Sequence, residues 1–145
     1  MREGDIAPVM EMAARLNEAP QWTEAAYARA LDPGATPRRI ALVAEDSDGV
    51  ITGVIMAMLI PPHAELESIA VEPTAQRQGV GGCLLEDLLR SLRKAEITEV
   101  MLEVRASNRA ARGFYASAGF AETGQRPAYY SDPEEDAILL ARQLL

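Results

Sequence analysis

A short turn between an apolar run and a leucine-rich segment carries the residue types best suited to binding an anion. Residues 69–71 are apolar, a polar stretch follows, Gly79 and Gly81 are two residues apart, and leucines from Leu84 onward share one helical face. A helix N-terminus offers unpaired backbone N–H groups and the positive end of a dipole, which bind phosphate, and glycine lets the backbone approach a pyrophosphate closely. The turn therefore predicts phosphate or pyrophosphate binding. The alternative is that these glycines serve only the turn, because a lone glycine pair is a weak signal.

Apolar runs and turn signals predict the elements that position this turn. Helices are expected behind three N-cap candidates, Asp5, Thr23 and Asn108, and along the leucine-rich segment. Trp22 and Tyr27 are placed to form a hydrophobic staple at the second of these helices. The predicted strands are residues 40–45, 50–59, 65–71, 100–104, 120–129 and 137–144.

The order of the elements predicts the fold class. It is helix, helix, three strands, helix, strand, helix and two strands. Consecutive strands favour an antiparallel meander, whereas the strand–helix–strand unit in the middle requires a parallel pair with a right-handed crossover. We therefore expect an α/β (α+β) fold, a mixed central sheet flanked by about four helices, built by residues 1–145 as a single domain.

Composition excludes several classes of protein. The 145 residues carry a formal net charge of −8, which argues against a protein held to nucleic acid by its overall field and favours a cationic partner. The longest apolar run, residues 54–60, is the length of a strand, so no membrane span is expected. With one cysteine, Cys83, and one histidine, His63, we expect no intramolecular disulfide, no metal site and a cytoplasmic location.

Four sequence blocks resemble one enzyme family. Gln76-x-x-Gly79-x-Gly81 resembles the Gln/Arg-x-x-Gly-x-Gly/Ala signature of the GCN5-related N-acetyltransferase (GNAT) superfamily. The second half of that fold is similar to Leu102-Glu103-Val104-Arg105-x-Ser107-Asn108 and to Phe114-Tyr115-x-x-x-Gly119-Phe120. Tyr129-Tyr130 followed by Glu135-Asp136-Ala137 resembles the end of bacterial ribosomal-protein-alanine N-acetyltransferases (RimI-like). The resemblance runs from about Ile6 to the C-terminus, and it leads us to expect a short or missing edge strand before the first helix.

The resemblance implies acetyl-CoA as the cofactor. Its pyrophosphate is expected on the amides of residues 78–82, and its pantetheine arm along the strand edge near Ile69 and Val71. Asn108 is similar to a family residue that contacts the same arm. The implied cofactor-binding residues are Ile69, Ala70, Val71, Gln76, Arg77, Gln78, Gly79, Val80, Gly81, Gly82, Asn108 and Tyr115.

The resemblance also implies the acid and the base of a direct acetyl transfer. Glu103 matches the motif residue assigned as base, Glu65 aligns with a strand glutamate used by histone-type members, and Glu67 has no clear counterpart. Glu103 lies between two apolar strand residues and should face away from them; each glutamate can alternatively be solvated or pair with Arg105. Tyr115 resembles the general acid that protonates the departing thiolate, and the alternative is aromatic packing. Cys83 is expected to be a small buried helical residue, not a nucleophile.

The acceptor is expected to be the α-amine of a protein N-terminus, with a basic ribosomal protein as one candidate. A terminal α-amine has a pKa of about 7.7–8.0 and is partly neutral at cellular pH, whereas a lysine, near 10.4, needs more help. The acceptor groove should form around Pro20-Gln21-Trp22 and Tyr129-Tyr130, together with Glu65 and Glu67. Alternatives are a small-molecule amine, a lysine side chain, or a non-catalytic acyl-CoA-binding module. The chain is expected to act as a monomer or weak dimer.

Overall fold

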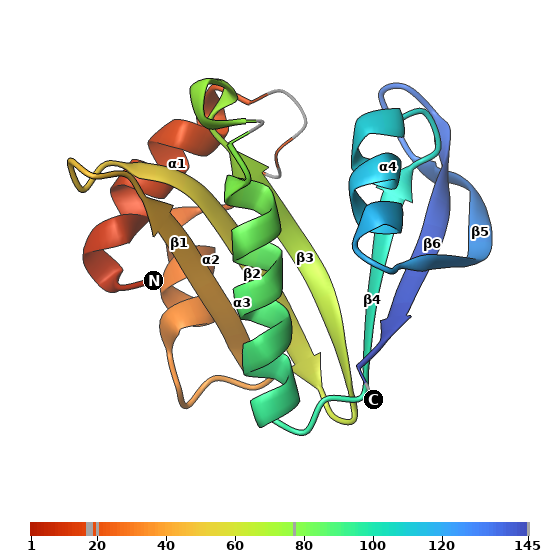
Figure 1. Ribbon diagram of the computed structural model, residues 1–145, viewed down its shortest axis with the longest axis horizontal. Coiled ribbons are helices and arrows are strands. Elements are labelled where there is room, and N and C mark those ends of the chain that lie inside the picture. Colours follow the sequence, from red (N-terminus) through yellow and green to blue (C-terminus); the bar gives the residue numbers. More distant parts are fainter. Residues whose placement is uncertain (17–18, 20, 77, 145) are drawn as a thin grey trace.

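The computed structural model describes residues 1–16, 19, 21–76 and 78–144, and the predicted order of elements is confirmed (Figure 1). Two short 3-10 helices, η1 and η2, accompany four α-helices and six strands among these residues. Their bounds are η1 Glu3–Asp5, α1 Ile6–Ala14, α2 Glu24–Leu31, β1 Arg39–Glu45, β2 Ile51–Ile60, β3 His63–Val71, η2 Pro73–Ala75, α3 Val80–Lys94, β4 Glu99–Arg105, α4 Arg109–Ser117, β5 Ala121–Tyr130 and β6 Glu135–Gln143.

The six strands form one mixed sheet in the order β1-β2-β3-β4-β6-β5. β3 and β4 are its parallel pair, as the sequence predicted, and the other neighbours are antiparallel. The parallel pairing covers only His63–Glu99, Ala64–Val100 and Glu65–Met101. Beyond Glu65 the two strands diverge, so that the sheet opens between them toward the C-terminal ends of both strands (Figure 1).

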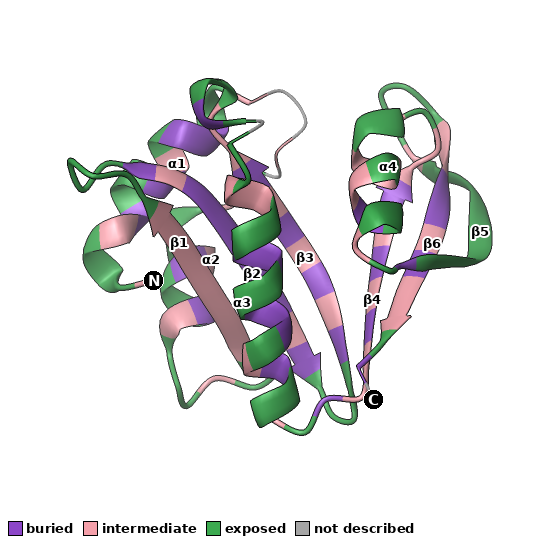
Figure 2. Cartoon of the chain, viewed as in Figure 1, coloured by how far each residue is buried: buried purple, intermediate pink, exposed green. Residues whose placement is uncertain are grey.

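Helices cover both faces of the sheet. α3 packs on one face through five leucines that are all at most 4% exposed, namely Leu84, Leu85, Leu88, Leu89 and Leu92. α1 and α2 cover the other face, where Val9, Met12 and Tyr27 are buried against Met56 and Ala70. Figure 2 shows α3 exposed on its outer side and β5 exposed along most of its length. Each helix thus buries one stripe, as amphipathic spacing requires.

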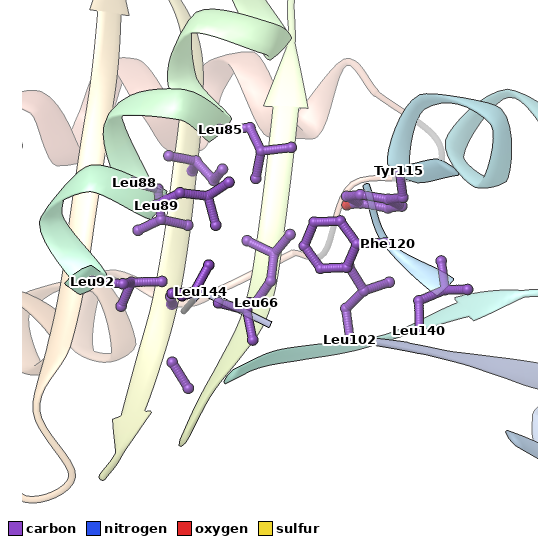
Figure 3. Packing of buried hydrophobic residues seen from close by; sticks show 14 of the residues in the cluster. Leu66, Leu85, Leu88, Leu89, Leu92, Leu102, Tyr115, Phe120, Leu140 and Leu144 are labelled. Carbon is purple, nitrogen blue, oxygen red and sulfur yellow. The ribbon is translucent and has the colours of Figure 1, made fainter. Parts of the chain in front are cut away.

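The larger core joins the two sides of the opening. It extends from the leucines of α3 across the sheet to Leu102 and Leu140 and on to Tyr115 and Phe120 (Figure 3). The buried aromatic rings of α4 and of the residue after it therefore rest on the same apolar cluster as α3. The strands β4, β6 and β5 are therefore held against β1, β2 and β3 mainly by this apolar packing, because the two groups of strands share only the short β3–β4 pairing.

A β-bulge in β3 changes which residues face the α3 side of the sheet. Met56 of β2 is opposite Ser68 and the next residue, Ala57, is opposite Leu66, so Glu67 is an extra residue on β3. Leu66 and Ile69 consequently both pack into the core beside α3, although they are three residues apart. A bulge bends a strand and resets its alternation, and it leaves the glutamates of β3 on the α1–α2 face.

Local capping chemistry sets most of the helix starts. The Thr23 hydroxyl accepts from the Ala26 N–H at 3.1 Å, and the Trp22 and Tyr27 ring centroids are 5.7 Å apart, which confirms the cap and the staple. Asn108 Oδ1 accepts from the Ala111 N–H at 3.1 Å. Asp5 precedes α1 but does not cap it with its side chain, because its carboxylate accepts from the Arg2 N–H at 2.7 Å.

Two other expectations concern the N-terminal segment and α3. No strand precedes α1 among residues 1–16, and the Met1 amino group donates to the carbonyl of Ala41 on the edge strand β1 at 3.1 Å. The prediction that Cys83 is buried is wrong: its side chain is exposed, because the leucines beginning at Leu84 already form the buried face of α3.

Candidate active site

A cleft of about 1240 Å³ occupies the opening between the diverging ends of β3 and β4. Its walls come from both strands, the connection between α1 and α2, α4, and the turn between β5 and β6. The predicted site residues that line it are Trp22, Glu65, Glu67, Ile69, Ala70, Val71, Gln76, Glu103, Asn108, Tyr115, Tyr129 and Tyr130. Segments far apart in the sequence therefore meet in one place. Two predicted residues, Pro20 and Arg77, lie outside the described part of the chain.

The glycine turn lies beside the cleft and not in its wall. Residues 78–82 follow Gln76, which lines the cleft, and they form the start of α3. Gly79 is the N-cap residue of this helix, and its carbonyl oxygen accepts a hydrogen bond from the Cys83 N–H at 3.0 Å. Gly79 has φ +80°, a conformation that glycine adopts without cost. A Cβ on Gly81 would lie 3.4 Å from Phe114 Cε1 and 3.7 Å from Val71 Cγ2. The start of α3 thus packs closely on α4 and on the end of β3, next to the cleft.

Two glutamines of the predicted cofactor loop use their side chains to hold the loop itself. Gln76 Nε2 donates to Val71 O at 3.1 Å, and the Gln76 backbone N–H donates to Glu72 O at 3.0 Å. Gln78 Nε2 donates to Thr74 O at 3.2 Å. Both side chains therefore fix the approach to α3, which leaves the main chain of the turn as the surface that can meet a phosphate group.

The C-terminal half of β3 has one free edge. From Leu66 to Val71 the strand pairs with β2, but its pairing with β4 has already ended at Glu65. An unpaired strand edge presents backbone N–H and C=O groups that can bind an extended ligand. This edge leads directly to the glycine turn. The arrangement therefore fits a long ligand with an amide-bearing arm and a terminal diphosphate.

The three candidate carboxylates differ in their ion-pair partners. Glu103 points away from the α3 core, as predicted; its Oε1 is 3.5 Å from Arg126 Nη2, and it accepts a hydrogen bond from the Tyr129 hydroxyl. Glu67 receives two hydrogen bonds from Arg39, Nε to Oε1 at 2.8 Å and Nη2 to Oε2 at 3.3 Å. Glu65 has no ion-pair partner within the described residues. None of the three pairs with Arg105.

Burial and like charges raise the pKa of Glu65. Desolvation is the largest cause, followed by repulsion from the Glu103 and Glu67 carboxylates, and Arg126 opposes the change. A carboxylate that is poorly solvated and lies near other carboxylates holds a proton or a cation more readily than a free one. The acceptor side of the cleft is therefore suited to an ammonium group.

Tyr115 lies in the cleft wall with its ring among other aromatic side chains. Its centroid is 5.3 Å from that of Phe114 and 5.5 Å from that of Phe120, both edge to face. Burial raises the pKa of the Tyr115 phenol to about 12. Full proton transfer to a thiolate with a pKa of about 8.5 would be uphill by on the order of 5 kcal/mol. Donating a hydrogen bond to a developing thiolate is therefore the chemistry that this phenol is best suited to perform.

Aromatic side chains from two further segments also line the cleft. Trp22 comes from the connection between α1 and α2, where Gln21 Nε2 donates to Ala13 O at 2.7 Å. Tyr129 and Tyr130 come from the end of β5, with ring centroids 5.1 Å apart, and Tyr129 is 50% exposed. Trp22 from one predicted acceptor segment and both tyrosines of the other therefore line one cavity, whereas Gln21 is not part of its lining.

The sequence reasoning missed the arginines that organise these walls. Arg39 binds Glu67 and its Cζ lies 5.8 Å from the centroid of the Trp22 ring. Arg126 is near Glu103, and its Cζ is 5.5 Å from the Tyr129 centroid. Neither belongs to a motif. An alternation argument could have placed Arg39 on the face opposite Ile40, but not opposite a particular glutamate.

The fold is shared with several solved acetyltransferases. The crystal structure of the ribosomal-protein-S18-alanine N-acetyltransferase from Escherichia coli has a TM-score of 0.86 at 32% identity and covers 99% of this chain and 90% of that one. Naa20 from Chaetomium thermophilum, solved with a bisubstrate analogue, has a TM-score of 0.85 at 26% identity, covering 99% and 84%. The fold thus defines the protein's class, that of proteins with the N-acetyltransferase fold.

Sequence comparison gives the family. Residues 8–120 match the model of the acetyltransferase (GNAT) family, and the chain belongs to this family. It is 43% identical to the [ribosomal protein bS18]-alanine N-acetyltransferase of Escherichia coli K12 over 96 residues, which cover 65% of each protein. A putative enzyme of the same name from Bacillus subtilis is 30% identical over 140 residues, covering 97% of this chain and 90% of that one. The predicted family, fold class and acetyl-CoA cofactor are thereby confirmed at the level of the family. Within the described residues, no helix has the length and apolarity to cross a membrane.

The charge environment of Glu65 leads to a stability prediction. Because the folded state raises its pKa, the ionised carboxylate destabilises the fold at neutral pH, and the penalty disappears below the unfolded pKa of about 4.3, where the group is protonated in both states. Glu65→Gln should therefore raise the thermal midpoint at pH 7, and the gain should shrink as the pH falls toward 4. Thermal melts monitored by circular dichroism measure both effects.

The matched control is Glu67→Gln, which breaks the contact with Arg39 and should lower the midpoint at pH 7. A Glu65→Gln variant that melts below the wild type at pH 7 would contradict the electrostatic assignment.

Proposed function

We propose that the protein transfers the acetyl group of acetyl-CoA directly to the α-amine of a protein N-terminus. The observation that carries this proposal is the cleft itself. It brings together the free edge of β3, which leads to the glycine turn, with carboxylates and the side chains of Trp22, Tyr129 and Tyr130. The relatives named as ribosomal-protein alanine N-acetyltransferases support the same acceptor class.

The residues present fit acetyl-CoA. Acetyl-CoA, when bound, supplies an acetyl group on a thioester that an amine can attack. We expect the backbone of residues 78–82 to hold its pyrophosphate and the free edge of Ile69–Val71 to pair with its pantetheine arm. Asn108, the N-cap residue of α4, and Tyr115, within α4, also line the cleft, and we expect both to contact the bound cofactor.

Two carboxylates can take the proton of the attacking amine. Glu103 is held by Arg126 and Tyr129, and its place in the motif favours it as the base. Glu65 makes no ion pair within the described residues, and its raised pKa favours it on grounds of basicity. We propose Glu103 as the base and Glu65 as the second candidate. Tyr115 donates a hydrogen bond to the departing sulfur.

The intrinsic pKa of the acceptor favours an α-amine over a lysine side chain. At a pKa of about 7.7–8.0 the acceptor amine is partly neutral without assistance, whereas a lysine near 10.4 is almost fully protonated. The net charge of −8 suits a basic target, and a ribosomal protein tail is a candidate of that kind. A cytoplasmic location and a monomeric or weakly dimeric state remain predictions.

The acceptor class is tested by a substrate panel. Acetyl transfer is measured on peptides with a free N-terminus, on lysine peptides with a blocked N-terminus, on polyamines and on aminoglycosides. We expect turnover on the free N-termini, and among them the highest rates on small first residues followed by basic ones. Activity confined to the other three groups would reject the proposed acceptor and favour a small-amine or lysine acetyltransferase.

The catalytic roles are tested by two isosteric substitutions. Loss of a general base costs about 10²–10⁴-fold in rate, so Glu103→Gln should lower kcat within that range, and Tyr115→Phe should lower it by a smaller factor. Glu65→Gln identifies the base: if it reduces kcat more than Glu103→Gln does, the two roles are exchanged. Binding of acetyl-CoA, measured by calorimetry, should be unchanged in both glutamate variants. Unchanged turnover together with intact binding would show that the catalytic residues are wrongly assigned. Binding of acetyl-CoA without turnover in the wild type would instead leave a non-catalytic acyl-CoA-binding module.

The glycine turn is tested by acetyl-CoA affinity. Gly81→Val should weaken binding by at least on the order of tenfold, because the added side chain meets Phe114 and Val71 and displaces the turn. Arg77→Ala should weaken it less, since main-chain amides hold the phosphates. Gly4→Val, at a glycine with open space around its Cα, is the control. Calorimetry that shows Arg77→Ala as the more damaging change would indicate side-chain recognition instead.

A further inference from the structure

Arg105, at the end of β4, makes an unusual number of contacts with one turn. Its Nη1 donates to Pro133 O at 3.1 Å and its Nη2 donates to Ser131 O at 3.2 Å. Nη1 is also 3.4 Å from Glu135 Oε1. The guanidinium carbon lies 4.5 Å from the centroid of the Tyr130 ring, a cation–π distance. One side chain thus contacts the turn between β5 and β6 at four residues.

Glu135 extends this contact to the start of α4. While one of its oxygens faces Arg105, the other accepts from the Ser107 N–H at 2.5 Å. The hydrogen bonds from Ser107 and the nearby Arg105 hold the pKa of Glu135 below its usual value, so the carboxylate stays charged at neutral pH. The β4–α4 connection and the β5–β6 turn are therefore joined through two charged side chains.

The turn needs such support because its backbone pairing is interrupted. The register of β5 and β6 is lost between Arg126 and Tyr130, and pairing resumes only at Tyr130–Glu135. Ala128 and Asp132 both have positive φ, at 50° and 53°, which is strained for residues with a Cβ. Asp136 contributes one further bond, from the Ala128 N–H at 2.8 Å. The segment that carries both tyrosines of the acceptor wall is thus held largely by side chains.

We infer that Arg105 is a positioning residue that fixes Tyr130 and its turn, and so sets the affinity for the acceptor and not the rate of acetyl transfer. The inference rests on the proposed function, because it takes this turn as part of the acceptor groove. The guanidinium is already bound to two carbonyls, a carboxylate and an aromatic face, so it is not available as a phosphate ligand. Lysine cannot replace it, since a single ammonium does not reproduce the planar fork and the stacking.

The kinetic test uses Arg105→Ala and Arg105→Lys with an alanine-initiated peptide that has a free N-terminus. We expect Arg105→Ala to raise KM for the peptide by about ten- to a hundredfold, with kcat at saturating peptide within about threefold of the wild type. Arg105→Lys should recover only part of the loss. The affinity for acetyl-CoA, measured by calorimetry, should stay unchanged. If Arg105 acts through Tyr130, the effects of Arg105→Ala and Tyr130→Ala on KM should be clearly less than additive.

The control is Arg142→Ala, which removes another arginine-to-carbonyl contact, from Nη1 to Ala118 O at 2.6 Å, on the far side of α4 from this turn. It should leave the KM for the peptide unchanged. A fall in kcat at constant KM, an equal loss of acetyl-CoA affinity, or wild-type kinetics in Arg105→Ala would each overturn the inference.

A second measurement does not depend on the acceptor. Amide hydrogen exchange over residues 128–135 should be faster in Arg105→Ala than in the wild type or in Arg142→Ala. If the wild type acetylates no N-terminal peptide but this exchange is faster, the proposed function fails while the positioning role stands. Unchanged exchange in Arg105→Ala overturns the positioning role whatever the acceptor is.

Discussion

The parallel pairing of β3 with β4 ends after three residue pairs, and the rest of the site depends on that early end. If the ladder continued, the backbone groups of Ile69–Val71 would be satisfied by β4 and no cavity would separate the strands. Because the pairing stops at Glu65, the rest of β3 keeps an unpaired edge, and side chains of β3 and β4 face each other across the cleft. The shared apolar cluster of Leu102, Tyr115 and Phe120 keeps the opening from closing or widening.

The charges in the cleft are arranged by the same geometry. Glu67, the extra residue of the bulge, pairs with Arg39, while Glu65, two residues earlier, makes no ion pair within the described residues. Glu103, on the facing strand, is balanced by Arg126 from β5. One carboxylate is therefore left without an ion pair beside two carboxylates that have arginine partners. This arrangement concentrates the attraction for a cationic amine at Glu65 instead of spreading it over the wall. The cost is local electrostatic strain at Glu65.

Much of the fold could be predicted from the sequence because its signals are local. Thr23 and Asn108 cap the helices they precede, and apolar spacing located the strands to within a few residues. Asp5 failed as a cap because a nearer donor, the Arg2 N–H, takes its carboxylate. Cys83 was misplaced because a helix with five buried leucines needs no further apolar residue.

The site was only partly predictable. Motif residues on β3, β4 and α4 do line one cleft, yet their partners could not be predicted. Arg39 and Glu67 are 28 residues apart, on strands β1 and β3 that are separated by β2, and the sequence gives no sign of their contact. The contacts of Arg105 with Ser131 and Pro133 depend on a turn whose two positive-φ residues, Ala128 and Asp132, are not glycines. Pairings of this kind arise from register and strain, not from composition.

The short junction between β3 and β4 also affects how the molecule responds to occupancy. The chain behaves as two half-molecules, residues up to α3 and residues from β4 onward, which share an apolar seam but few main-chain bonds (Figure 1). A ligand bound in the cleft contacts both halves and so stabilises their arrangement. By mass action, occupancy at 100 times its dissociation constant adds about 2.7 kcal/mol to the free energy of unfolding. The concentration of acetyl-CoA therefore affects the stability of the protein as well as its rate of turnover.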